Sequence, residues 1–425
     1  MSTHATSRPD ALLELFPPGT QRDAAGRLRV GGCDLDELAE RFGTPLYLVD
    51  EAALRAQARR FRRALEARRP RSRVLFASKA FPCAPVLAVL ASEGLGFDVA
   101  GGGELAVALA AGVDPECVVL HGNAKTEAEL RMAVAAGVGT IVVDNHDDID
   151  RLETIVTGRQ HVLVRVLPDV APDTHAAIST GAAGSKFGLP LTEARRAIDR
   201  LRASDRLVLG GVHVHIGSQI LDTAPFGDAV ARLAELGEFD VYDLGGGLGV
   251  SYTGEESPPS PEEWIGALAD ATDRHLPAAA RIMVEPGRSM VARAGITLYR
   301  VVTVKRGTPT FVAVDGGMGD NLEVALYGQR FVATLAGRAG EGEPVELVGR
   351  HCESGDRLIS GARLPDPVPG DLLAIPVTGA YCFTMANNYN GALRPPVVFC
   401  GEGRAWPVVR RETFEDLLAR NLPVP

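Results

Sequence analysis

The chain has 425 residues, 46% of them hydrophobic and 23% charged, and its formal net charge is −10. This length is sufficient for one large domain plus a second, or for two domains of ordinary size. The negative charge argues against a nucleic-acid partner, and no apolar run approaches the ~20 residues of a membrane span.

The N-terminal sequence lacks the basic and then apolar order of a secretory signal, so we expect a cytoplasmic protein that acts on small molecules. Six scattered cysteines include no CxxC pair, which predicts reduced thiols rather than a zinc site or a disulfide framework. The 44 basic residues include only four lysines: Lys79, Lys125, Lys186 and Lys305. Because arginine supplies nearly all of the positive charge, each lysine is a candidate for a role that needs its amine.

Eight short apolar runs, each ended by glycine or polar residues, predict strands between residues 73 and 288. The predicted strands are residues 73–80, 96–104, 117–123, 140–145, 161–168, 207–218, 240–249 and 281–288. Helix-length stretches separate most of them, and two of these begin at Thr126 and Thr192 with an acid close behind, which predicts helix N-caps. This alternation predicts a parallel (β/α)8 barrel of the TIM type.

After about residue 295 the pattern changes to alternating strands with Gly and Pro turns and little helix. The runs at 296–307, 310–317, 343–356 and 371–382 predict a mainly β domain of sandwich or barrel type. Residues 26–35 predict one more strand, which can join this domain. We therefore expect a barrel domain over residues 44–295 and a β domain over residues 1–43 and 296–425.

Polar residues cluster where the predicted barrel strands end. They are Lys79, Asp98, His121, Asn145, Arg165, His213, His215, Gly245 to Gly247, Glu285 and Arg288. In a parallel barrel these positions share the C-terminal rim, where active sites lie.

Lys79 ends an apolar run, and desolvation there would favour the neutral amine of a Schiff-base lysine. A lysine that merely extends to solvent from a strand end is an equally good interpretation. The motifs DLGGGLG (243–249) and EPGR (285–288) each place glycines just past a strand, and their N–H groups can approach a phosphate closely.

The motif HVHIGS (213–218) has two functional interpretations. His213 and His215 could hold a metal ion, as in barrel hydrolases. Alternatively, one imidazole stacks on a flat cofactor while Ser218 binds the cofactor phosphate. A structural, hydrogen-bonded role is expected for at least one of the two histidines.

Glu285 distinguishes between these interpretations. A carboxylate beside phosphate-binding glycines is electrostatically unfavourable unless a cationic group lies between, and a protonated pyridine nitrogen is such a group. A Schiff-base lysine, phosphate-binding glycines, a stacking imidazole and this carboxylate together describe a site for pyridoxal phosphate, without a metal.

The predicted β domain adds further candidates. Cys352 lies between His351 and Glu353, where it could be a proton donor or a reduced surface thiol. Tyr381 and Tyr389 carry hydroxyl groups that could reach a phosphate or a substrate, or serve packing only.

In this order, the motifs resemble those of the fold-type III pyridoxal-phosphate decarboxylases, most closely diaminopimelate decarboxylase. The resemblance covers nearly the whole chain, through FASKA, ISTGAAGSKFG, HVHIGSQ, DLGGGLG, EPGR, VDGGMGDN, ALYG, HCESGD, GAYCF and NNYN. It implies a barrel plus a β domain, in a head-to-tail homodimer whose active sites each borrow a loop from the partner.

The resemblance also implies roles for residues in the site. Lys79 would form a Schiff base with pyridoxal 5′-phosphate, His215 would stack on the ring, and Glu285 would bind the pyridine nitrogen. Asp98 would lie near the ring and its stacking histidine. The phosphate would be bound by Ser218, Gly246, Gly247, Gly287 and Tyr381.

The implied reaction converts meso-diaminopimelate to L-lysine and carbon dioxide, in lysine biosynthesis. Glu285 would keep the ring protonated as an electron sink, and Cys352 of the partner subunit would protonate the α-carbon. The residues implied to contact substrate are Arg288, Glu323, Tyr327, Glu353 and Tyr381.

One departure concerns the substrate. The family usually presents an arginine four residues before the tyrosine of ALYG, followed by a proline, whereas this chain has Glu323 and Val324. Glutamate cannot form a bidentate clamp on a carboxylate. Either Glu323 faces outward while Arg288 or Arg330 holds the distal carboxylate, or the substrate is a related amino acid such as ornithine, lysine or a secondary-metabolite precursor.

Three further hypotheses remain. A degenerate homologue without activity is disfavoured by the intact cofactor motifs. A metal-dependent barrel hydrolase using His213 and His215 would leave Glu285 and the glycine turns without a role. A non-catalytic pyridoxal-phosphate carrier would resemble the bare barrel and would lack the β domain with HCESGD.

Overall fold

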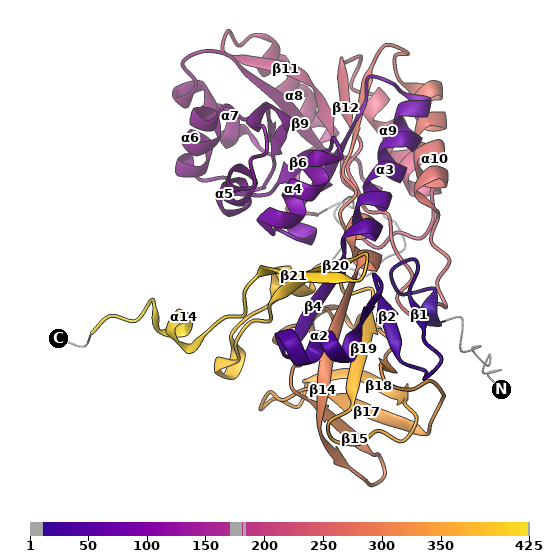
Figure 1. The fold of residues 1–425 in the computed structure, drawn as a ribbon. Helices are drawn as coiled ribbons and strands as arrows, with labels where there is room; N and C mark the ends of the chain where they lie inside the picture. Colours follow the sequence, from indigo (N-terminus) through magenta and orange to yellow (C-terminus); the bar gives the residue numbers. More distant parts are fainter. Residues whose placement is uncertain (1–11, 171–180, 182–183, 424–425) are drawn as a thin grey trace. The chain divides into compact units, whose positions relative to one another are not determined.

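The computed structural model describes residues 12–170, 181 and 184–423 (Figure 1). Two compact units are present. Unit 1 comprises residues 1–54, 251–257 and 291–425, and unit 2 comprises residues 55–250 and 258–290. Of the motif ISTGAAGSKFG, residues 178–180, 182 and 183 lie outside the described residues.

Unit 2 contains a closed ring of eight parallel strands. They are β5 Arg73–Ala77, β6 Gly96–Val99, β7 Val118–Leu120, β8 Thr140–Val143, β9 Gln160–Leu167, β11 Leu207–His213, β12 Val241–Asp243 and β13 Arg281–Val284. The ring closes because β13 pairs with β5 and β8 pairs with β9. A two-residue strand, β10 (Leu189–Pro190), pairs with β9 outside the ring. The predicted (β/α)8 barrel is confirmed.

Helices alternate with the barrel strands along the chain (Figure 1). They are α3 Glu51–Arg68, α4 Ala84–Ser92, α5 Gly102–Ala110, α6 Glu127–Ala136, α7 His146–Ile155, α8 Leu191–Arg202, α9 Ala224–Ala234 and α10 Pro261–His275. Thr126 caps α6 in a capping box with Glu129, as predicted. The predicted cap at Thr192 is wrong: α8 begins directly after β10, with Pro190 at the N-cap and Thr192 inside the first turn.

Interior-facing side chains fill the barrel in a layer. Leu75, Val119, Val142, Leu163 and Val241 form one buried cluster, with one residue from each of five strands. Branched side chains pack well on pleated strands, so this layer of the barrel interior is a packed apolar core. The polar side chains of the predicted site lie instead at or near the C-terminal ends of the strands.

Unit 1 is built on a nine-stranded, mostly antiparallel sheet. Its strands are β4 Leu46–Asp50, β14 Gly295–Lys305, β15 Phe311–Val314, β16 Thr334–Leu335, β17 Pro344–Val348, β18 Arg357–Arg363, β19 Leu372–Pro376, β20 Val397–Gly401 and β21 Arg404–Val409. The predicted mainly β domain is confirmed. Because β4 pairs with β14 and β20, the strand that follows residue 44 belongs to this unit.

Residues 26–35 do not form a single strand of the large sheet. They contribute β2 (Leu28–Val30) and β3 (Cys33–Asp34), which form a separate three-stranded sheet with β1 (Gln21–Arg22). Gly31 and Gly32 both have positive φ, which allows the tight turn that splits the predicted strand in two. Asp34 then caps α2 (Leu35–Phe42) through the N–H groups of its first turn.

No helix within the described part of the chain is long and apolar enough to cross a membrane. All six cysteines are described and free, which agrees with the expectation of reduced thiols.

Candidate active site

The C-terminal ends of the barrel strands bring the predicted polar residues to one rim of unit 2. Lys79 lies in a 3-10 turn (Ser78–Ala80) directly after β5, and Asp98 lies in β6. His213 is the last residue of β11, and Glu285 follows β13. Asn145 has a structural role, because its side chain accepts the Asp148 N–H as the N-cap of α7.

Lys79 presents an amine at the rim. Its Nζ lies 3.8 Å from Oδ2 of Asp98, and its side chain is 40% exposed, so the amine is only partly desolvated. Burial raises the pKa of Asp98, although the neighbouring His121 and Lys79 act in the opposite direction. The pair therefore places an accessible amine next to a buried carboxyl group.

Glu285 is buried and contacts two imidazoles. Its Oε1 lies 2.8 Å from Nε2 of His121, and its Oε2 lies 3.4 Å from Nε2 of His213. Burial by itself raises the pKa of Glu285, but His121 and His213 outweigh it and hold that pKa well below the usual range. The geometry therefore supports an ionised carboxylate in the barrel interior.

His213 and His215 point to different partners, so they do not form the hypothesised HxH metal pair. The described residues include one group with ligand atoms close enough to hold a metal ion: His121, His213, Asp243 and Glu285. His215 is not part of that group. Its Nδ1 instead accepts the Gly246 N–H at 3.2 Å.

That bond fixes the tautomer of His215. Because Nδ1 is an acceptor, the proton of the neutral ring lies on Nε2. Burial, followed by the positive charge of Lys79, lowers the pKa of His215 well below its usual value. A neutral imidazole held by the backbone is suited to stacking on a flat ring.

The glycine turns bring backbone N–H groups to the rim. A Cβ on Gly246 would lie 2.1 Å from the Glu285 carbonyl oxygen, and one on Gly247 would lie 2.4 Å from the Gly217 oxygen. Only glycine fits at these two positions. Beside them, Nε of Arg288 donates to Oγ of Ser218 at 3.4 Å.

The geometry of these groups is compatible with bound pyridoxal phosphate. The crowded glycines and Ser218 form a cradle suited to a phosphate, and buried Glu285 can accept a pyridinium N–H. Lys79 supplies the amine that the cofactor aldehyde requires.

In unit 1, Glu323 begins the short helix α12 (Glu323–Tyr327) and is 1% exposed. The hydroxyl of Tyr252 donates to its Oε2 at 3.4 Å, and the Tyr252 ring packs edge-on against Phe331. The hypothesis that Glu323 faces solvent is therefore wrong. Arg330, the alternative carboxylate ligand, is exposed and bonded to Glu255 at 2.8 Å.

The HCESGD motif forms an exposed loop held at both ends. Oxygens of buried Asp356 accept the N–H groups of Met318 and His351, each at 2.7 Å. The Cys352 N–H donates to Asn390 at 2.8 Å, while the Cys352 and Glu353 side chains are exposed. This loop therefore presents its thiol and carboxylate outward.

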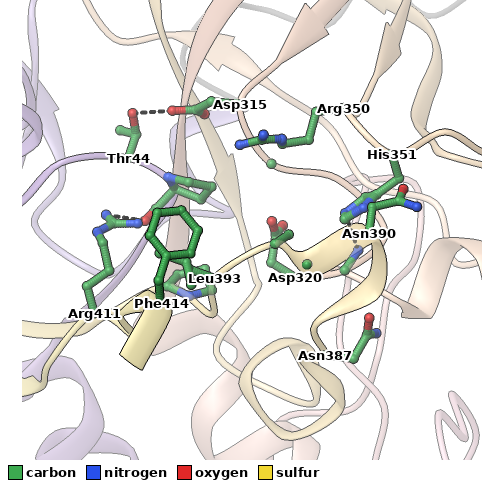
Figure 2. Close-up of a pocket in the computed structure, with 16 residues that line it drawn as sticks. Thr44, Asp315, Asp320, Arg350, His351, Asn387, Asn390, Leu393, Arg411 and Phe414 are labelled. Atoms are coloured by element: carbon green, nitrogen blue, oxygen red, sulfur yellow. Dashed lines mark hydrogen bonds between the residues drawn. The ribbon is translucent and has the colours of Figure 1, made fainter. Parts of the chain in front are cut away.

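A pocket of about 200 Å³ lies beside this loop within unit 1 (Figure 2). Its wall includes Asp320, whose pKa is raised to about 7 by burial. Asp320 accepts hydrogen bonds from the Tyr299 hydroxyl and the Gly317 N–H. His351 also lines the pocket and accepts the Gly319 N–H.

Two other predicted residues of unit 1 are partly exposed. Tyr327 is the last residue of α12. Tyr381 has a left-handed backbone conformation (φ 64°) at the N-cap of α13 (Cys382–Met385). A non-glycine residue in this region is uncommon and is often found at functional sites.

The sequence did not assign roles to His121, Asp243 or Tyr252, although all three are buried against predicted site residues. The strand-end pattern already places His121 at the rim, and the same signal could have identified Asp243, which ends β12. No local pattern marks Tyr252, because its partner Glu323 lies 71 residues away.

The pyridoxal-binding domain of the pyridoxal-dependent decarboxylases matches residues 51–292. The diaminopimelate decarboxylase of Actinosynnema pretiosum subsp. auranticum is 46% identical over 439 residues, covering 99% of this chain and 98% of that protein. The diaminopimelate decarboxylase of Bacillus subtilis (strain 168) is 42% identical, covering 96% and 98%.

Solved structures agree with this relationship. The diaminopimelate decarboxylase from M. jannaschii in co-complex with L-lysine aligns with a TM-score of 0.90 and 32% identity, covering 96% of this chain and 98% of that one. These matches confirm the resemblance and the expected cofactor. The chain belongs to the family of fold-type III pyridoxal-dependent decarboxylases that includes diaminopimelate decarboxylase.

Proposed function

We propose that this enzyme decarboxylates meso-diaminopimelate to L-lysine in the cytoplasm, as a step of lysine biosynthesis. The observation that supports this most strongly is the barrel rim, where buried Glu285, the amine of Lys79 and the glycine turns match the needs of pyridoxal phosphate. Relatives that cover nearly the whole chain are named diaminopimelate decarboxylase, and three structures of that enzyme contain L-lysine.

Residues of unit 2 would hold most of the cofactor. Lys79 would bind its aldehyde carbon covalently, His215 would stack on its ring, and Asp98 would lie near both. Glu285 would accept the pyridinium N–H, which it can do because the histidines favour its ionised form. The phosphate would be bound by Ser218, Gly246, Gly247, Gly287 and Tyr381.

When bound, pyridoxal phosphate supplies an electron sink for the electron pair that remains after carbon dioxide leaves. Glu285 keeps the proton at the ring nitrogen, because a buried carboxylate favours the neighbouring positive charge. The cradle orients the phosphate, so the substrate amine reaches the same position in each turnover.

The α-carbon requires a proton after carbon dioxide leaves, and we assign its delivery to Cys352 of the partner subunit. The exposure of Cys352 and Glu353 supports this, because a loop that completes another subunit's site must project from its own. The enzyme would therefore be a homodimer with shared sites. Glu353 would contact the distal amine of the substrate.

Arg288, Tyr327 and Tyr381 would complete the substrate contacts. The burial of Glu323 favours a second candidate function, the decarboxylation of an amino acid whose distal end carries only an amine, such as ornithine or lysine. A buried carboxylate would attract such an amine and repel a distal carboxylate.

Carbon dioxide release over a panel of amino acids tests both candidates. The panel contains meso-diaminopimelate, both enantiomers of lysine and of ornithine, and arginine. We expect the highest kcat/KM for meso-diaminopimelate. A higher value for ornithine or lysine would select the second candidate, and no release from any compound would contradict both.

A further inference from the structure

Two carboxyl groups, Asp243 and Glu285, share a buried cluster with His121 and His213 in the barrel interior. The ligand atoms of the four side chains all lie within 4.8 Å of one another, and no member is more than 5% exposed. Two carboxylates this close in a medium that excludes water cannot both be ionised without a large free-energy cost. The cluster must therefore hold extra protons or a cation.

The histidines account for Glu285 alone. Each of its oxygens faces the Nε2 atom of one imidazole, at 2.8 Å for His121 and 3.4 Å for His213. His213 remains neutral because burial lowers its pKa to about 3. It can donate one N–H to Glu285, but it carries no charge that would offset a second carboxylate.

Asp243 is in a different position. Its Oδ1 accepts the Gly245 N–H at 3.1 Å, whereas its buried Oδ2 receives no hydrogen bond from a described residue. A bare carboxylate oxygen in this setting would be strongly unfavourable. A protonated Oδ2 would instead be a donor, with Glu285 as its acceptor. Burial, followed by the negative charge of Glu285, raises the pKa of Asp243 well above its usual value.

Other charged groups near the cluster do not reverse this balance. Asp98 adds negative charge and favours a neutral Asp243. Arg165 is a buried cation at this rim, and the carboxylate with which it forms an ion pair is Asp144, at 3.7 Å, rather than Asp243. Lys79 lies beside Asp98, and His215 is neutral because burial lowers its pKa.

We propose that Asp243 is a neutral carboxylic acid that donates its proton to Glu285, and that it acts as a positioning residue for this carboxylate. The shared proton keeps Glu285 ionised and fixes its orientation. The protonation state is a property of this chain alone, whereas its consequence for the cofactor rests on the proposed function.

Infrared spectroscopy of the full chain at pH 8, with aspartate labelled by carbon-13, tests the protonation state with and without bound pyridoxal phosphate. We expect a protonated-acid band that shifts on labelling and is missing in Asp243→Asn. The control is Asp148→Asn, because Asp148 is also buried but is paired with a cation, Nζ of Lys125, at 2.7 Å. If Asp243→Asn removes an ionised carboxylate band instead, the proposal is wrong.

Cofactor binding tests the positioning role. Asparagine is a neutral donor of the same shape, so Asp243→Asn should change the Kd for pyridoxal phosphate by no more than about threefold, whereas Asp243→Leu should weaken binding at least about tenfold. Equal losses in both variants would overturn the positioning role. So would one equivalent of a divalent metal in the purified protein, since a metal ligand must be ionised. If the wild type did not bind pyridoxal phosphate, the proposed function would fail while the infrared result stood.

Discussion

The barrel rim and the HCESGD loop present their chemical groups in opposite ways. At the rim, Glu285 is buried and contacted by two histidines, and glycine turns hold the backbone in place. In the loop, Cys352 and Glu353 project outward, although Asp356 fixes the ends of the loop. The rim is thus organised within unit 2, whereas the loop exposes its groups, as the proposed shared site requires.

The largest effect is expected at Lys79, the proposed covalent attachment point of the cofactor. Lys79→Ala should lower kcat/KM by at least about 10³-fold, because it removes the amine that lies beside Asp98 at the rim. Purified wild-type protein should show an absorption band near the visible region from the covalently bound cofactor, and Lys79→Ala should lack this band. Lys305→Ala is the matched control, and an unchanged spectrum in Lys79→Ala would remove the covalent assignment.

Mixing two inactive variants tests whether the loop acts in its partner's site. Lys79→Ala and Cys352→Ala homodimers should each be nearly inactive, and a mixed population should recover activity in one of the two sites of each heterodimer. About a quarter of the wild-type rate is expected for an equal mixture that exchanges freely. Carbon dioxide release before and after mixing measures this. No recovery in verified heterodimers would contradict a shared site.

Glu323 should change substrate preference rather than the chemical step. If it repels a distal carboxylate, Glu323→Gln should raise kcat/KM for meso-diaminopimelate relative to ornithine by about tenfold, because the charge is removed at constant shape. Tyr252→Phe is the control that removes only the hydroxyl bonded to Glu323. An unchanged ratio in Glu323→Gln would leave the second candidate function without support.

The smallest effect is expected at Asp320, within the pocket of unit 1. Its folded pKa of about 7 lies above its ordinary value, so the folded state binds more protons and loses stability as pH rises from about 4 to 7. Asp320→Asn should flatten this decline in thermal unfolding experiments, by about a few degrees in Tm.

Asp371 is the matched control for Asp320, because its pKa is lowered rather than raised and its stability should change with pH in the opposite direction. Burial raises its pKa, but the bonds from Arg338 outweigh burial and lower it. Its stabilisation is therefore present above its unfolded pKa and lost as pH falls below about 4. If Asp320→Asn followed the wild-type pH profile, the raised pKa would be wrong.

Regular features were predicted from the sequence because they have local causes. Strand ends located Lys79, His215 and Glu285, since parallel strands share a rim. The prediction of a cap at Thr192 was wrong because α8 follows β10 directly, so its N-cap is Pro190, two residues before Thr192. The division of residues 26–35 depended on the turn at Gly31 and Gly32, within a run that otherwise resembles one strand.

The remaining features depend on contacts across long sequence separations. The burial of Glu323 is set by Tyr252, and an acid in the first turn of a helix is equally compatible with a solvent-facing position. The partnership of Asp243 and Glu285 arises where neighbouring barrel strands end, with no local signal for a shared proton.

The most direct test of the central claim is product analysis with cofactor-depleted enzyme and meso-diaminopimelate, before and after addition of pyridoxal phosphate. We expect no reaction without the cofactor and, once the cofactor is restored, one L-lysine formed for each carbon dioxide released. Carbon dioxide release that does not depend on pyridoxal phosphate, or restored enzyme that forms no lysine, would contradict the account.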